Sequence, residues 1–101
     1  MYLIELDKIP NQTFSIMLDN VNYRIALRTI QKLTYISVWA NGELLFYNQL
    51  CTPNAYVNPF KYVSKNGKFF FKSTTGDYPY YKDFGVNQNL YFLTKEEIAN
   101  A

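Results

Sequence analysis

The chain has 101 residues, which allows one domain with a modest core rather than two domains. The net charge of +2 is too small to indicate a nucleic-acid footprint, and no run of like charges indicates a polybasic anchor. Aromatic residues form 19% of the chain, with ten tyrosines and eight phenylalanines. This composition favours β-strands, and tyrosine suits surfaces that are half buried against a partner.

Cys51 is the only cysteine, so no disulfide can form within the chain, and we expect assembly in a reducing compartment. No apolar run reaches the length of about 18 residues that predicts a membrane-spanning helix. Residues 1–10 lack the basic start and the small-residue cleavage site of a signal peptide, so we expect no secretion signal.

The first third of the chain predicts three strands. Residues 2–6 are apolar and end before Pro10, which cannot pair. Residues 12–19 and 22–30 alternate between apolar and polar side chains, the pattern of a strand with one buried face, and a turn at Asp19 and Asn20 separates them. The side chains predicted to share the buried faces are Phe14, Ile16 and Leu18 in the first segment and Tyr23, Ile25 and Leu27 in the second.

The middle of the chain predicts a hairpin. Residues 33–40 are apolar on both faces, which is typical of a central strand or of one that meets a partner. Asn41 and Gly42 favour a type I′ turn, and residues 43–48 return as the partner strand. We expect Leu44 and Phe46 on one face of that strand and Leu45 and Tyr47 on the other.

The pattern weakens over residues 49–62, where Pro53 and Pro59 predict an ordered loop or a broken edge. A second Asn-Gly pair, at residues 66 and 67, predicts a hairpin joining residues 61–65 to 68–73. A loop follows, and residues 89–93 predict a last strand. Thr94 with Glu97 three places on has the form of a capping box that starts a short C-terminal helix, which needs docking to be stable.

About eight short strands with frequent turns predict an all-β fold, either a small antiparallel β-barrel or a sandwich of about 7–9 strands. We expect a single β-barrel domain over residues 1–101, with a short C-terminal helix or tail. The sequence leaves the choice between a closed barrel and an open sandwich undecided.

The side chains that carry most catalytic chemistry are missing or isolated. The chain has no histidine, so it has no Ser-His or Cys-His pair, and Cys51 fits a small buried apolar residue better than a nucleophile. The acidic residues fall in turns or at a helix start, and no clustered ligand spacing predicts a metal site. We therefore expect no enzyme activity, no catalytic residue, no cofactor and no metal.

One set of segments resembles the phage baseplate plug family, small proteins of contractile-tailed phages and prophages. The resemblance rests on Ile-Pro-Asn-Gln at residues 9–12, on the Tyr23-x-Ile25-x-Leu27-Arg28 strand, and on later segments that include "NPF", "GDYPYYKDFG" and "LYFL". It covers nearly the whole chain. Each motif is a strand or a turn, and the family supplies no catalytic motif to transfer.

The resemblance implies a structural protein of the virion, made in the host cytoplasm and placed at the central axis of the tail baseplate. It would help to form or plug the tube end through contacts with other baseplate, hub and tail-tube proteins, as a homo-oligomeric ring. Neither a membrane nor nucleic acid is implied as a partner.

We expect the protein contacts in two loops rich in Tyr and Pro, residues 52–60 and 76–84, because stiff amphipathic protrusions lose little entropy on binding. The interface candidates are Tyr56, Phe60, Tyr78, Tyr80 and Tyr81. Alternatively, these loops fold back over an open end of the fold. Replacing Tyr80 and Tyr81 together with alanine distinguishes the two, since lost assembly with a folded monomer indicates contact residues and unfolding indicates core residues.

Two other functions stay open. The first is a barrel-type binding module for single-stranded nucleic acid or glycan, suggested by lysines interleaved with aromatics in "KNGKFFFKS". Against it, alternation sends Phe69 and Phe71 to the face opposite Phe70, so some of these rings belong to the core. The second is an inhibitor-like or accessory protein of a phage or bacterium with no virion role. Genes for tail tube, hub and spike beside this one would favour the baseplate.

Overall fold

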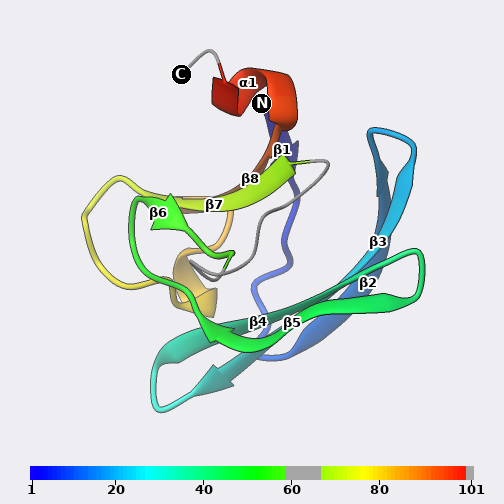
Figure 1. Ribbon diagram of the computed structural model, residues 1–101. Coiled ribbons are helices and arrows are strands. Elements are labelled where there is room, and N and C mark those ends of the chain that lie inside the picture. The colour runs from blue at the N-terminus through cyan, green and yellow to red at the C-terminus, as the bar shows by residue number, and fades with distance from the viewer. Residues whose placement is uncertain (59–66, 100–101) are drawn as a thin grey trace.

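The computed structural model describes residues 1–58 and 67–99. Its strands form two antiparallel four-stranded sheets that face each other (Figure 1). Sheet A has the order β1 (Tyr2–Ile4), β8 (Gln88–Thr94), β7 (Gly67–Ser73) and β6 (Ala55–Tyr56). Sheet B has the order β2 (Gln12–Leu18), β3 (Val21–Ile30), β4 (Leu33–Ala40) and β5 (Glu43–Leu50). The all-β prediction is confirmed, and because the two sheets are separate in the described residues, the fold is a sandwich rather than a closed barrel.

Sheet B is a meander whose three hairpins share one turn geometry. Both central residues of each turn have positive φ, with values of 48° and 84° at Asn41 and Gly42. Positive φ at both positions is the mark of the type I′ turn, whose twist matches that of the strands. The predicted turns at Asp19–Asn20 and Asn41–Gly42 are confirmed, while Gln31 and Lys32 adopt the same backbone without the usual turn residues. The predicted alternation of β2 and β3 is confirmed by burial of Leu18, Tyr23, Ile25 and Leu27.

The expected faces of β5 are wrong, because the strand contains β-bulges. Val38 pairs with Phe46 but Trp39 pairs with Leu44, so Leu45 is an extra residue in β5. Leu44 is therefore exposed while Phe46 and Leu45 both pack on the core. A second register shift leaves Asn48 with φ of 49°, and its N–H donates to the Ser37 hydroxyl at 2.8 Å. Bulges of this kind twist an edge strand and hinder pairing with another chain.

Sheet A contributes several buried phenylalanine side chains to the core. Phe69 and Phe71 of β7 point inward and are fully buried, while Phe70 points outward, as the alternation predicts. The weak segment before it forms the short edge strand β6, which pairs with Phe70 and Phe71 of β7. β1 is shorter than predicted and ends at Ile4. Of the hairpin predicted at residues 61–73, residues 61–66 lie outside the described part of the chain, and Gly67, which was expected in the turn, begins β7.

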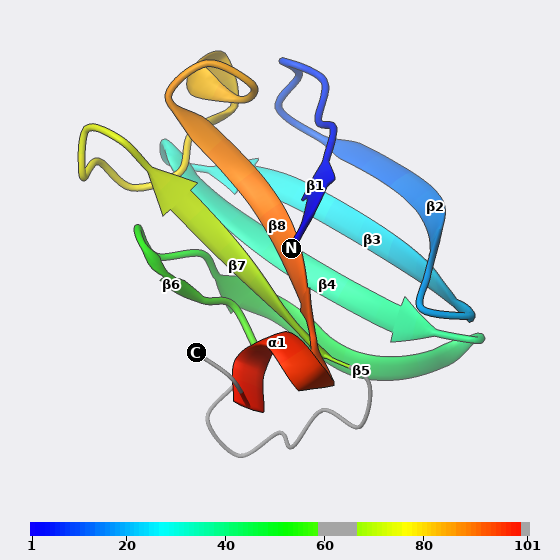
Figure 2. The same ribbon diagram turned by 90° about the horizontal axis from the view of Figure 1, so that it is seen from above.

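Three rings connect the two sheets across the core. Tyr23 of sheet B meets Phe69 of sheet A edge to face, with ring centroids 5.4 Å apart, and lies 5.5 Å from Phe92. Phe69 and Phe92 are themselves 5.2 Å apart. Seen from above, strands β7 and β8 lie over β3 and β4 (Figure 2). Edge-to-face pairs of this kind add about 0.5–1.5 kcal/mol each beyond the area they bury.

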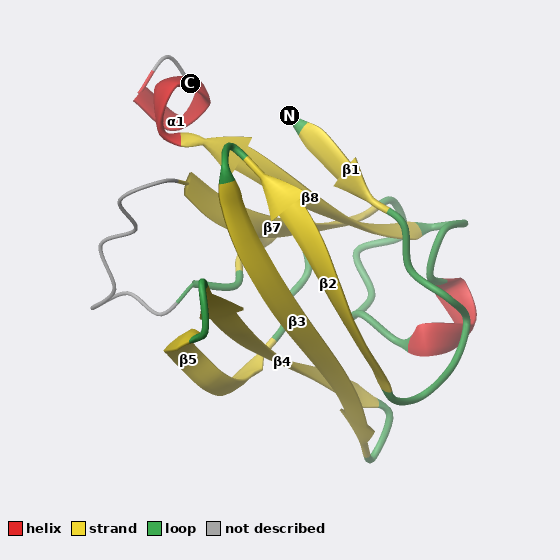
Figure 3. Cartoon of the chain, turned by 90° about the vertical axis from the view of Figure 1, so that its right-hand side faces the viewer, coloured by secondary structure: helices red, strands yellow, loops and turns green. Residues whose placement is uncertain are grey.

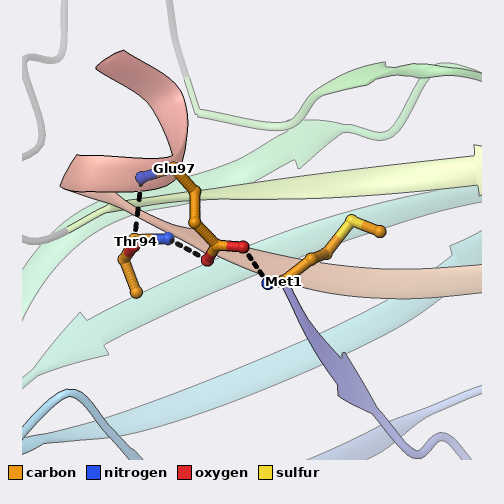
Figure 4. A network of polar contacts seen from close by, with 3 residues as sticks. All are labelled: Met1, Thr94 and Glu97. Atoms are coloured by element: carbon orange, nitrogen blue, oxygen red, sulfur yellow. Dashed lines mark hydrogen bonds and ion pairs between the residues drawn. The ribbon is translucent and has the colours of Figure 1, made fainter. Parts of the chain in front are cut away.

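The C-terminal helix α1 (Lys95–Ala99) is docked at the end of sheet A beside the N-terminus (Figure 3). The predicted capping box is confirmed. The Thr94 N–H donates to the Glu97 carboxylate at 3.0 Å, and the Glu97 N–H donates to the Thr94 hydroxyl at 3.2 Å. The same carboxylate also accepts a bond from the Met1 ammonium group, so it holds both chain ends together (Figure 4).

Candidate functional site

The loop between β7 and β8, which contains three of the predicted interface residues, is firmly held. Pro79 is buried, and its carbonyl accepts a 2.7 Å bond from the Thr34 hydroxyl of sheet B. The fully buried Gln88 amide donates to the carbonyls of Asp77 and Tyr78 at 3.2 and 3.0 Å. Its oxygen accepts the Tyr80 N–H at 2.7 Å. The loop, which includes the short 3₁₀ helix η1 (Tyr81–Asp83), therefore behaves as a fixed part of the sandwich.

The three tyrosines of this loop differ in their surroundings. Tyr78 is 49% exposed. Tyr80 and Tyr81 are half buried with ring centroids 4.8 Å apart, and Tyr81 packs against the core. The alternative in which the loop folds back therefore describes Tyr81 better than Tyr78.

Tyr56 lies apart from this group, on the outer face of sheet A. Its ring contacts Phe70 at 5.6 Å, and the Lys68 ammonium group lies 5.1 Å from its centroid. The register extends the contact into a row across all four strands, because Tyr56 pairs with Phe70, Phe70 with Tyr91, and Tyr91 with Leu3. Phe60, the remaining candidate, lies outside the described residues.

A second site lies on the outer face of sheet B, at residues that no sequence motif marks. The Arg24 guanidinium lies 4.2 Å from the centroid of the Trp39 ring. Beside this pair is a shallow pocket of about 220 Å³, lined by Ser15, Asn22, Arg24, Trp39 and Gly42. These residues come from β2, β3, β4 and the β4–β5 turn, so only the strand order and register bring them together.

The described residues contain few groups that could act as a metal ligand or a nucleophile. Within residues 1–58 and 67–99, no group of three or more His, Cys, Asp or Glu side chains could hold a metal ion. Cys51 is fully buried, and desolvation raises the pKa of its thiol, which opposes formation of the reactive thiolate. Across the same residues, no helix has the length and apolar character needed to traverse a lipid bilayer.

These features define a rigid β-sandwich whose buried polar groups hold loops in place and whose outer faces present aromatic side chains. A family model described as "Cyanophage baseplate Pam3 plug gp18" matches residues 1–96, and the chain belongs to this family. No curated protein matches the chain. The resemblance to baseplate plug proteins is thereby confirmed. Membership supports a structural, non-enzymatic role in the baseplate of a phage tail.

Proposed function

We propose that the chain helps to form or plug the central tube and hub of a contractile-tail baseplate through protein–protein contacts, as several copies in the assembled virion. The family match carries this proposal, since it spans residues 1–96 of 101. The fold agrees with it, because a plug must resist deformation, and here the two sheets are joined by buried rings and by a loop anchored on Thr34 and Gln88.

The contacts are proposed to run through Tyr56, Tyr78, Tyr80 and Tyr81, with Phe60 as a further candidate. Tyr78 is the best placed of these, since its loop is already fixed by Gln88 while its side chain is half exposed. A ring that is held before binding loses little conformational entropy when a partner covers it. Tyr81 packs partly on the core, so its replacement combines two effects.

The test uses the phage or prophage that carries this gene. Deleting the gene should leave particles whose tube end or baseplate is incomplete in electron micrographs, and the wild-type chain supplied from a plasmid should restore them. Normal, infectious particles without the chain would contradict the proposal.

The tyrosine variants then locate the contacts. Tyr78→Ala and Tyr56→Ala should reduce the amount of chain in particles while leaving the thermal midpoint of the free protein unchanged. Tyr2→Ala is the matched control, because Tyr2 is also about half exposed but lies outside both loops. The pair Tyr80→Ala/Tyr81→Ala should reduce incorporation as well, with some loss of stability from Tyr81. If all of these variants were incorporated as well as wild type, the two loops would not be part of the interface.

One feature of sheet A favours a second candidate function, the binding of single-stranded nucleic acid. The row of Tyr56, Phe70 and Tyr91 is flanked by Lys68 and Lys72 on the same face of sheet A. Stacked rings beside lysines are the usual platform for single strands. An oligo(dT) probe measured by fluorescence anisotropy should bind more weakly at high salt and lose affinity in Phe70→Ala if this function is real. Absence of oligo(dT) binding at low salt would refute the nucleic-acid-binding function.

A further inference from the structure

We infer that the pocket beside Arg24 and Trp39 is a docking point for a carboxylate on an acidic surface of a neighbouring baseplate protein. The inference rests on the proposed baseplate function and adds to it the chemistry of one partner contact. It uses a face of the molecule that the tyrosine loops do not occupy.

The pocket is rich in hydrogen-bond donors. Arg24, Ser15 and Asn22 line it, and within the described residues neither the Ser15 hydroxyl nor the Asn22 side-chain amide makes a hydrogen bond. Among the described residues Arg24 forms no ion pair, and its guanidinium contacts the Trp39 ring. A guanidinium, a hydroxyl and a side-chain amide around one space can all donate to an anion, and guanidinium binds a carboxylate through two parallel hydrogen bonds.

The pocket is also shaped before any partner arrives. Stacking on Trp39 holds the guanidinium plane, which would otherwise be mobile on a long side chain. The Asn41 N–H donates to the Asn22 carbonyl at 2.8 Å, and the Asn22 N–H donates to the Asn41 side chain at 3.0 Å. These two bonds fix the β4–β5 turn against β3 and so fix the wall that Gly42 contributes. The side chains of the pocket therefore lose little further conformational entropy when a partner binds.

Charge and surroundings favour a protein as the source of the carboxylate. The strands of sheet B carry Arg24 and Arg28 on the outer face, and their only acidic residue is Glu43, at the β4–β5 turn. Exposed apolar side chains flank the pocket on both sides, with Met17 opposite Asn22 and Leu44 opposite Trp39. Arginine and tryptophan are enriched among the residues that contribute most to binding at the centre of protein interfaces.

Particle incorporation tests the inference. Wild-type and variant chains are supplied to the deletion strain, and the chain present per particle is measured by quantitative mass spectrometry. Arg24→Gln should lower incorporation roughly tenfold or more, as expected for a central interface arginine. Arg28→Gln, on the same face but outside the pocket, should lower incorporation only about two- to threefold, because it removes one exposed positive charge that attracts an acidic partner only weakly. Lys8→Gln, an exposed lysine before β2, is the charge-matched control and should have no effect.

A chemical test identifies the partner atom. Arg24→Lys places an amine in the pocket, and a carbodiimide then joins that amine to a carboxylate in contact with it. The expected product links residue 24 to an Asp or Glu of another baseplate protein, and wild-type particles should lack it. Cross-links only to this same chain, or none despite normal incorporation, would overturn the inference.

The possible outcomes distinguish failure of the proposed function from failure of the carboxylate pocket. Absence of the wild-type chain from particles would refute the proposed function together with the inference. Normal incorporation of Arg24→Gln, or equal losses in Arg24→Gln and Arg28→Gln, would refute the carboxylate pocket alone. Because Arg24 is exposed, the variant should fold, and an unchanged thermal midpoint checks this.

Discussion

The hydroxyl of Thr34, buried in β4 of sheet B, donates a 2.7 Å hydrogen bond to the carbonyl of Pro79 in the long loop of sheet A. The Thr34 carbonyl in turn accepts the N–H of Cys51 just after β5. One residue therefore holds three segments that are far apart in sequence. This contact explains why the tyrosine loop is a fixed feature of the sandwich.

Replacing Thr34 with valine should destabilise the protein. The change keeps the shape but leaves the buried Pro79 carbonyl without its donor, which costs about 1–3 kcal/mol in the free energy of unfolding. Urea denaturation measures the loss. Thr13→Val makes the same change on the exposed face of β2 and should stay within about 0.5 kcal/mol of wild type. Equal effects from the two variants would mean that the hydroxyl bond contributes nothing.

Gly67 should tolerate no side chain, in contrast to Gly42. Gly67 has φ of 153°, and a Cβ there would collide with the Leu93 carbonyl oxygen and come within 2.6 Å of the Phe92 ring. Gly67→Ala should therefore cost several times more stability than Gly42→Ala, whose Cβ would enter open space. Gly42→Ala should cost only about 1 kcal/mol, because of its positive φ. Thermal unfolding of the pair checks the order, and equal losses would contradict the close approach of β7 to β8.

Cys51 should make stability fall at alkaline pH. Burial raises the pKa of its thiol, so the unfolded chain loses a proton above about pH 8.5 while the folded chain keeps it. The contribution is complete below that pH and is lost progressively above it. Urea denaturation between pH 7 and about 9.5 should show this decline, and Cys51→Ala should reduce it. The same slope in both proteins would show that other groups cause it.

Thr94 and Glu97 should act as one unit at the start of α1. Each side chain satisfies the other's backbone N–H, so Thr94→Ala and Glu97→Ala should each cost about 1 kcal/mol, and the double variant should cost less than the sum. Amide hydrogen exchange at Thr94 and Glu97 follows the local effect. Glu96→Ala, an exposed change in the same turn, is the control. Strict additivity would argue against a reciprocal cap.

Local patterns were sufficient for the strands whose two faces differ. In β3, alternation alone placed Tyr23, Ile25 and Leu27 inside and Arg24 outside, because side chains on a strand alternate between its faces. The capping box at Thr94 and the turn at Asn41 were equally readable, since each depends on neighbours within a few residues. β5 failed because a bulge inserts one residue, and nothing in "ELLFYN" marks the place where the alternation slips.

The sequence by itself determined that the protein is an aromatic, all-β chain without histidine, and its motifs were enough to indicate the baseplate plug family. Only the tertiary structure decided which surfaces exist. The Arg24–Trp39 pocket and the Tyr56–Phe70–Tyr91 row depend on which strands are neighbours and in what register they pair. Periodicity gives each strand its two faces. The register that places Arg24 opposite Trp39 is set by the β3–β4 turn at Gln31 and Lys32, which lack the usual turn residues. β7 and β8 are joined by a long loop, so their pairing depends on how the two sheets close around Tyr23, Phe69 and Phe92.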